Sequence, residues 1–429
     1  MSEIKKIIQQ PLFKITSLNS IHILLKLIFG FITSKALALF VGANGMAYVG
    51  NFRAFLNVVE NFSLLGIQNA IIKYVSKYQH DKTKLKSVLA TFGLLLLVAS
   101  ISISIVLILG AEYWSNQIFY PSEIYSNVFY FVAIVFPLYV FSTFCISVVN
   151  GFQEYKKVIY IQIISSAIAL VFSLFLIYYF STFGALISLI LAPVFVFFVC
   201  LFYLKNHISI SDVFSFQNFN FSVVKNLSEY VLMALVSGVI GSFVLLEIRT
   251  DIVTITGLQN AGIYEGLQRI SSYYLLFVSS IMTLYFYPKI AAKHSNLNAI
   301  IINYLKTIIP IFTFALVLIY IFRKVIIQVL FSSEFETMES LFLWQLLGDL
   351  LKAISLIFGT ILIANKKTKT FIITEIISLS ILYFSSNWML HTIGINGIVM
   401  AHTFTYFMYL LVMFLVFFKK MKSNNSTIG

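Results

Sequence analysis

Charged side chains are scarce in this chain: 10% of the 429 residues are Asp, Glu, Lys or Arg, whereas 60% are hydrophobic. A soluble fold of this length cannot bury so large an apolar fraction, so a membrane is the solvent that fits. Acidic residues are the scarcer kind, with 16 Asp and Glu against 29 Lys and Arg and a formal net charge of +13. Because the basic residues lie in short loops between apolar runs, they are typical of cytoplasmic membrane loops and not of a nucleic-acid-binding surface.

Cysteines, histidines and catalytic motifs are also scarce. The two cysteines, Cys145 and Cys200, each fall within an apolar run without metal-ligand spacing, so neither a disulfide nor a metal site is predicted. The sequence has no HExxH, Walker A, DxD or GxSxG motif and no soluble segment long enough for a nucleotide site. Only His22 and His402 lie in apolar runs, where a hydrogen bond between helices is predicted. We therefore expect no enzyme, no catalytic residue and no cofactor.

Apolar runs of about 20 residues, the length that crosses a bilayer as a helix, predict an all-α integral membrane protein with twelve spans. A polar loop separates six spans from six, which predicts an N-terminal lobe at 1–204, a cytoplasmic linker at 205–227 and a C-terminal lobe at 228–429. Nineteen of the 29 Lys and Arg residues fall on one side, which places both termini in the cytoplasm. The predicted spans are 18–40, 52–76, 87–110, 125–149, 158–180, 183–204, 228–250, 262–288, 300–322, 338–364, 370–388 and 395–418.

An internal repeat relates the two predicted lobes. A shift of 216 residues places Tyr48 on Tyr264 and Arg53 on Arg269. Because each lobe has an even number of spans, both lobes enter the membrane from the same side, and the repeats are parallel about an axis along the membrane normal. Substrate is then predicted to bind between the lobes.

Basic residues inside the predicted spans are the main functional signal. A charge at mid-bilayer costs roughly 2.5–3.5 kcal/mol on insertion scales, so such residues need a wet cavity, a partner or an anionic ligand. Together they predict a transporter with a cationic interior, although snorkelling to an interface is the alternative for those near span ends. Lys26 lies deep enough in its span that snorkelling would be strained, and it is a strong cavity candidate. The full set is Lys26, Lys35, Arg53, Lys73, Arg269, Lys306 and Lys352.

Acidic residues lie beside several of these bases. Glu265 precedes Arg269 by one helical turn, either as a neutralised structural pair or as part of a ligand site. Asp349 and Lys352 are three residues apart and either neutralise each other or form a switchable pair.

Two further acids belong to the same pattern. Glu60 shares a helix face with Arg53, whereas Glu247 lies in a charge cluster with Arg249 that a solvated helix end also explains. Because these acids lie near bases on wet helix faces, Asp349, Glu60 and Glu247 are the candidates to exchange a proton or Na⁺ during transport.

Three segments also carry a family resemblance: NFR at 51–53, KY at 73–74 and WQLLGDLLK at 344–352. With these segments, and in order over nearly its whole length, the chain resembles the Wzx-type translocases of O-antigen and enterobacterial common antigen. The resemblance implies two six-helix lobes in a V around a central cationic cavity. It also implies a flippase that moves an undecaprenyl-diphosphate-linked oligosaccharide, an O-antigen or similar surface polysaccharide repeat unit, to the periplasmic leaflet of the bacterial inner membrane by alternating access.

The resemblance covers most of the predicted site. It implies that basic residues contact the diphosphate and the glycan. The assignment of Arg269 to the binding set rests on the internal repeat alone. Besides membrane lipid, the implied partners are a polysaccharide polymerase and a chain-length regulator. One alternative is a drug or organic-cation antiporter on the same fold, for which we would expect an excess of buried carboxylates, whereas the polar faces of this chain hold at least as many bases as acids. The other is a structural partner of a polysaccharide assembly complex. The predicted binding set is Lys26, Lys35, Arg53, Arg249, Arg269 and Lys352.

Overall fold

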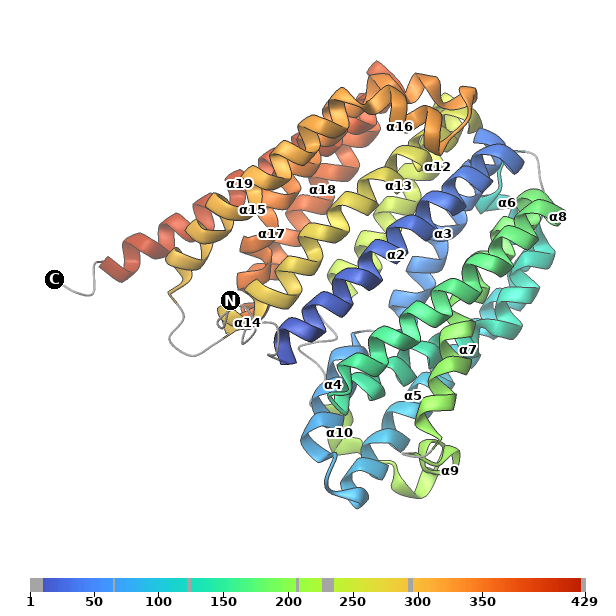
Figure 1. Cartoon of the computed structure of the whole chain (residues 1–429), viewed down its shortest axis with the longest axis vertical. Helices are drawn as coiled ribbons and strands as arrows, with labels where there is room; N and C mark the ends of the chain where they lie inside the picture. The colour runs from blue at the N-terminus through green and yellow to red at the C-terminus, as the bar shows by residue number, and fades with distance from the viewer. Residues whose placement is uncertain are drawn as a thin grey trace, which may run out of the picture. The chain divides into compact units, whose positions relative to one another are not determined.

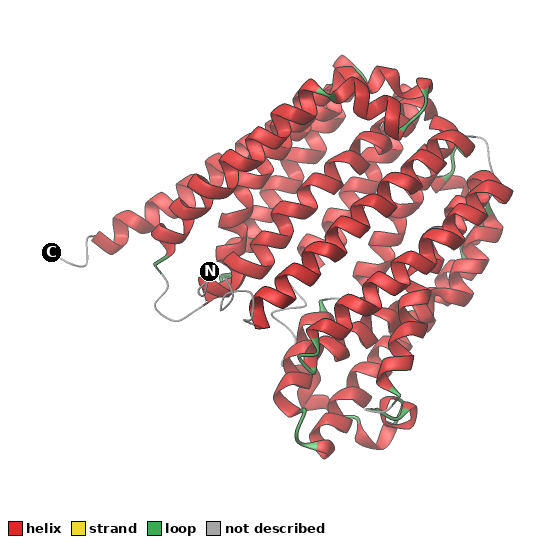
Figure 2. Cartoon of the chain, in the orientation of Figure 1, coloured by secondary structure: helices red, strands yellow, loops and turns green. Residues whose placement is uncertain are grey.

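The computed structural model describes residues 11–64, 66–121, 125–205, 208–225, 235–291 and 296–425 (Figure 1). Within these ranges the regular elements are helices and no strand is present (Figure 2). Eight of the described helices are long and apolar enough to cross a membrane, or nine if the bent pair α3 (Gly42–Leu64) and α4 (Ile67–Tyr78) is one span. The predicted class, an all-α integral membrane protein, is confirmed.

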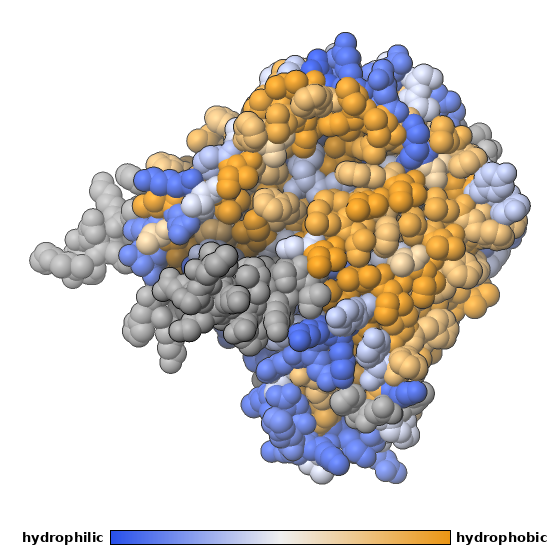
Figure 3. Space-filling view, in the orientation of Figure 1, coloured by the Kyte–Doolittle hydropathy of each residue, from blue (hydrophilic) through white to orange (hydrophobic). Residues whose placement is uncertain are grey.

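The chain divides into two compact units, of which the first comprises Met1–Val41 and Tyr48–Phe243. In this unit α7 packs along α8, α2 packs on α8, and α5 packs on α7. Polar side chains gather at the end that carries α4, α9 and α10, and apolar side chains cover the flank (Figure 3). Besides α3 and α4, its helices are α2 (Pro11–Phe40), α5 (Lys82–Leu109), α6 (Ala111–Ile118), α7 (Ser126–Gly151), α8 (Tyr155–Leu204), α9 (Ile210–Val213), η1 (Phe216–Asn218), α10 (Phe221–Lys225) and η2 (Leu235–Ile240).

Helix α8 is two membrane spans joined by a kink. Its 50 residues would extend about 75 Å if straight, more than twice the thickness of a bilayer core. Ser181 breaks it with φ 48° and ψ −127°, and its hydroxyl donates to the carbonyl oxygen of Phe40 at 2.8 Å. Three residues later, Gly184 lets the backbone of Leu176 approach where a Cβ atom would collide. The two legs correspond to the predicted spans 158–180 and 183–204.

The second unit comprises Gly42–Ala47 and Val244–Gly429. In it α17 packs against α13, α15, α18 and α19, and buried Tyr304 ties α15 to α17 through a 2.7 Å hydrogen bond to the carbonyl oxygen of Ala353. Helix α17 is therefore the central element of the unit. Its helices are α12 (Gly241–Thr256, which begins in the first unit), α13 (Leu258–Ile281), η3 (Met282–Phe286), α14 (Tyr287–Ala291), α15 (Leu297–Ile321), α16 (Arg323–Leu330), η4 (Ser333–Leu341), α17 (Phe342–Ala364), α18 (Thr368–Ile393) and α19 (Ile395–Asn425).

The boundaries of two predicted spans differ from the structure. The predicted span 52–76 begins at Gly42 and breaks at Gly66, whose φ is 71°. Polar residues such as Asn44 and Asn51 lower the local hydropathy, but the helix continues through them. Asn44 is exposed, whereas Asn51 is buried near Phe52 and Phe55 and donates to the carbonyl oxygen of Ile118 at 3.3 Å. For the predicted span 228–250, residues 226–234 lie outside the described residues, and its remainder is η2 and the first part of α12.

A count of twelve spans is consistent with these helices. The predicted lobes at 1–204 and 228–429 and the linker at 205–227 are a different partition from the compact units, and they stay a prediction.

Candidate functional site

A buried carboxylate joins two arginines in the second unit. Glu265, on α13, is 1% exposed, and its Oε1 accepts from Nε of Arg269 at 3.0 Å. Its Oε2 accepts from a terminal guanidinium nitrogen of Arg249, on α12, at 2.7 Å. The predicted pair of Glu265 and Arg269 is confirmed, and Arg249 is added to it. The three groups carry a formal charge of +1, so the cluster suits an anionic ligand better than a cation.

The local sequence explains the contact between Glu265 and Arg269 but not the contact between Glu265 and Arg249. Glu265 and Arg269 are four residues apart on one helix, a spacing that brings side chains together. Arg249 reaches them because α12 and α13 turn back on each other at Gly257, which has φ 89°. The guanidinium of Arg249 also lies 5.7 Å from the ring centre of Tyr264. Glycine adopts a positive φ at little cost, so Gly257 was the feature of the sequence that could have indicated this turn.

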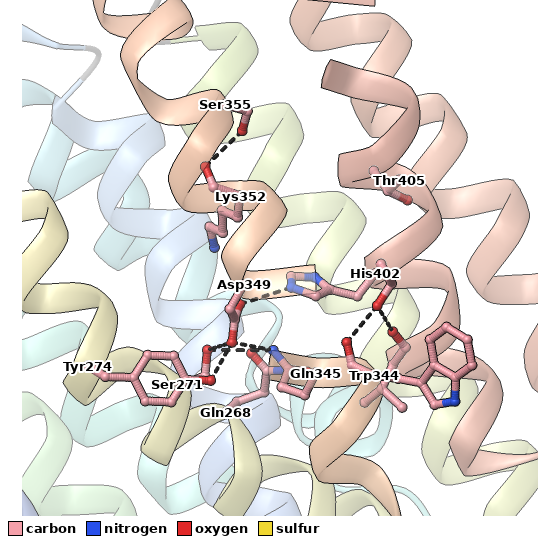
Figure 4. A network of polar contacts seen from close by, with 12 residues as sticks. Gln268, Ser271, Tyr274, Trp344, Gln345, Asp349, Lys352, Ser355, His402 and Thr405 are labelled. Atoms are coloured by element: carbon pink, nitrogen blue, oxygen red, sulfur yellow. Dashed lines mark hydrogen bonds and ion pairs between the residues drawn. The ribbon is translucent and has the colours of Figure 1, made fainter. Parts of the chain in front are cut away.

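A second polar cluster surrounds Asp349, which is fully buried in the middle of α17 (Figure 4). Three donors contact its Oδ2: the hydroxyls of Ser271 at 2.6 Å and Tyr274 at 2.5 Å, both from α13, and Nε2 of Gln345 at 3.0 Å. Its other oxygen, Oδ1, lies 3.0 Å from Nε2 of His402, on α19. The carboxylate therefore links α13, α17 and α19, and the helix–helix hydrogen bond predicted for His402 is confirmed.

Lys352 is not the ion-pair partner of Asp349, contrary to one sequence expectation. Within the part of the chain that the structure describes, the ion pair of Asp349 is with His402. The partly exposed Lys352 ammonium lies 5.5 Å from the ring centre of Tyr406. Residues at i and i+3 share a helix face, but the donors from α13 and α19 already occupy both carboxylate oxygens.

The remaining predicted acids are placed as follows. Glu60, on α3, is partly exposed and accepts from the Tyr139 hydroxyl of α7 at 2.6 Å. Glu247, on α12, is also partly exposed, two residues before Arg249.

Three predicted basic residues lie in the first unit. Lys26 is exposed on α2, whereas Lys35, on the same helix, and Arg53, on α3, are partly exposed. The structure brings Arg249 together with Arg269 in the second unit, where Lys352 also lies. Gln345 was expected on the same helix face as Asp349, four residues before it. The sequence reasoning missed the donors Ser271 and Tyr274, because single hydroxyl side chains in an apolar helix are common and carry no motif.

Long apolar helices enclosing buried charged clusters define a multi-pass membrane transporter. A sequence profile of the polysaccharide biosynthesis protein family matches residues 36–340, so the chain belongs to that family. The chain is 26% identical to the Lipid III flippase of Escherichia coli K12 over 389 residues, which cover 90% of this chain and 93% of the flippase. The Lipid III flippase of Shigella flexneri gives the same identity and coverage.

Solved structures show the same fold at lower sequence identity. An inward-facing multidrug resistance MATE family transporter of the MOP superfamily matches with TM-score 0.80 and 13% identity over 95% of this chain and 96% of the transporter. The lipid II flippase MurJ in an inward closed conformation matches with TM-score 0.71 and 15% identity over 94% of this chain and 87% of MurJ. The relatives are thus named as flippases and transporters, and the fold is that of the MOP superfamily.

Proposed function

We propose that this protein is a flippase. It moves an undecaprenyl-diphosphate-linked oligosaccharide, the repeat unit of an O-antigen or similar surface polysaccharide, from the cytoplasmic to the periplasmic leaflet of the bacterial inner membrane. The family membership and the similarity to Lipid III flippases over nine-tenths of the chain support the proposal. Alternating access at a midplane site moves the head group, while the prenyl tail remains in lipid.

The observation that carries the proposal is the buried cluster of Arg249, Glu265 and Arg269. A diphosphate carries about two negative charges, and planar guanidinium groups bind such oxygens through paired, charge-assisted hydrogen bonds. Glu265 holds both arginines in fixed positions, so their donors need little reorganisation to bind an anion. Arg53, Lys26, Lys35 and Lys352 complete the proposed binding set.

The driving force and the assembly are further parts of the proposal. Asp349, Glu60 or Glu247 exchanges a proton or Na⁺ as the protein reorients, and turnover that is unchanged after collapse of both gradients would contradict this coupling. Both termini face the cytoplasm, as the distribution of basic loops favours. A polysaccharide polymerase and a chain-length regulator act beside the flippase on its product.

A leaflet assay in cells tests the function. The lipid-linked oligosaccharide is labelled from the periplasmic face in cells that lack the protein and express the wild type, Arg249→Gln, Arg53→Gln or Arg323→Gln. We expect periplasmic labelling to fall about tenfold or more with the first two variants, because a neutral amide replaces a fork of charged donors. Lysine at either position should rescue it only in part.

The controls separate loss of function from loss of fold. Removing Arg249 leaves Glu265 paired with Arg269, so the cluster keeps a partner for its buried acid. Arg323 pairs with the partly exposed Glu339 outside the site, so Arg323→Gln should behave as wild type. Equal labelling in cells with and without the protein would refute the flippase proposal. A cation antiporter, which the MATE-like fold and the buried Asp349 favour, would then be the leading function.

A further inference from the structure

The pair of His402 and Asp349 lies outside the proposed anion-binding set, and it occupies the centre of the second unit. Three donors converge on Oδ2 of Asp349, and these stabilise the carboxylate as an anion. Within the part of the chain that the structure describes, the hydrogen-bond partner of its Oδ1 is His402. A carboxylate held in this way fixes the orientation of the imidazole that contacts it.

The geometry also selects which ring nitrogen exchanges a proton. An anionic acceptor 3.0 Å from Nε2 requires that Nε2 carries a hydrogen, so the neutral ring has its lone pair on Nδ1. Protonation at Nδ1 converts the imidazole to an imidazolium and leaves the hydrogen bond to Asp349 in place. The His402 side chain keeps 14% of its surface exposed, whereas Asp349 has none. The histidine is thus the more accessible member of the pair.

Gly348 makes room for this ring. A Cβ atom at Gly348 would collide with Cδ2 of His402 and lie 3.1 Å from its Nε2. The His402 ring can therefore approach the backbone of α17 only because Gly348, the residue before Asp349, has no side chain. On the other side, the ring of Tyr406 packs edge-on against His402 at 5.0 Å between centres.

The charges around His402 come from few elements. Helix α17 contributes Asp349 and Lys352, helix α13 contributes the neutral hydroxyl of Tyr274 behind Asp349, and α19 itself contributes Tyr406. Two other elements pack against α19. Their acidic and basic side chains are Lys369, Glu375 and His391 of α18 and Glu334, Glu336 and Glu339 of η4. Of these, Glu334 accepts from the Ala43 amide and Glu339 pairs with Arg323.

We propose that His402, paired with Asp349, is a proton-binding site of this transporter: where Asp349 is the coupling residue, the proton is carried by its partner His402, and Nδ1 is the atom that takes up and releases it. Uptake changes the summed charge of His402, Asp349 and Lys352 from 0 to +1. The step moves one proton between water and the ring and breaks no other bond. Its use in transport rests on the proposed function, whereas the protonation itself does not.

Histidine NMR on the full-length protein in nanodiscs tests the site directly. With ¹³C-labelled histidine, the resonance absent from His402→Gln identifies this residue. We expect its chemical shifts to change with pH in the wild type, and this pH dependence to differ in Asp349→Asn, which removes the charged partner. Gly348→Ala removes no titratable group but displaces the ring, and it should also alter the pH dependence. His391→Gln, on the exposed last turn of α18, is the matched control and should leave the His402 titration unchanged.

Flipping in proteoliposomes tests the use of the proton, with a fluorescent undecaprenyl-diphosphate monosaccharide as the probe. We expect a pH gradient to change the wild-type rate severalfold, and this ratio to fall to about one in His402→Gln while His391→Gln keeps it. A His402 resonance that does not titrate would overturn the inference whatever the flipping result. Titration without flipping would instead refute the proposed function and leave the proton site standing.

Discussion

Replacing Glu265 by glutamine tests whether the arginine cluster holds the second unit together. Glu265 is 1% exposed and accepts hydrogen bonds from Arg249 and Arg269 at 2.7 and 3.0 Å. Each hydrogen bond to a charged group contributes about 1.5–3 kcal/mol, and removing one partner of a buried pair costs about 3–5 kcal/mol. We therefore expect Glu265→Gln to lower the free energy of unfolding by about 3–5 kcal/mol, because two guanidinium groups lose their only shared counter-charge within the cluster.

The assay is reversible unfolding in mixed detergent micelles, followed by circular dichroism. Arg269→Gln should cost less, about 1.5–3 kcal/mol, because Arg249 still neutralises Glu265. The double variant should cost less than the sum of the two single changes, since both remove the same bond. Glu154→Gln is the matched control: its pair with Lys157, at 2.6 Å, is partly exposed at the surface and contributes about 0–1 kcal/mol. If Glu265→Gln were no more destabilising than Glu154→Gln, the cluster would have no structural role.

Two further predictions concern packing and a helix start. Gly262→Ala should lower the free energy of unfolding by about 1–3 kcal/mol, because a Cβ atom there would collide with the carbonyl oxygen of Ala43, and backbone cannot yield. Gly359→Ala, whose nearest neighbour would be the Tyr409 hydroxyl at 3.6 Å, should be neutral or stabilising by about 0.5–1 kcal/mol in the same assay; equal losses would contradict the packing argument. At the start of α5, hydrogen bonds from Thr83 and from the Lys84 amide lower the pKa of Asp81 to about 2. Because this pKa lies below the unfolded value, the stabilisation is present at neutral pH and is lost as the pH falls from about 4 towards 2. Hydrogen exchange in the first turn of α5 should therefore be faster in Asp81→Ala than in wild type at pH 7, with the difference shrinking towards pH 2; a difference independent of pH would count against the cap.

Contacts along one helix were within reach of sequence reasoning. The pair of Glu265 and Arg269 follows from a spacing of four residues, which any α-helix converts into proximity. The same rule failed for Asp349 and Lys352. The rule identifies which side chains of one helix can pair, but it cannot show that side chains of neighbouring helices take the place of one partner. Donors from α13 and α19 occupy the Asp349 carboxylate, and the rotation of those helices is set by packing.

The sequence by itself determined the class of protein. Hydropathy is a property of each segment alone, so long apolar runs require a membrane wherever they lie in the fold, and buried bases among them require partners or ligands. Only the tertiary structure decided which partners these are: Arg249 meets Glu265 across the turn at Gly257, and His402 meets Asp349 across the gap that Gly348 leaves. Each of these contacts depends on the offset and rotation of two helices, and no single segment encodes both.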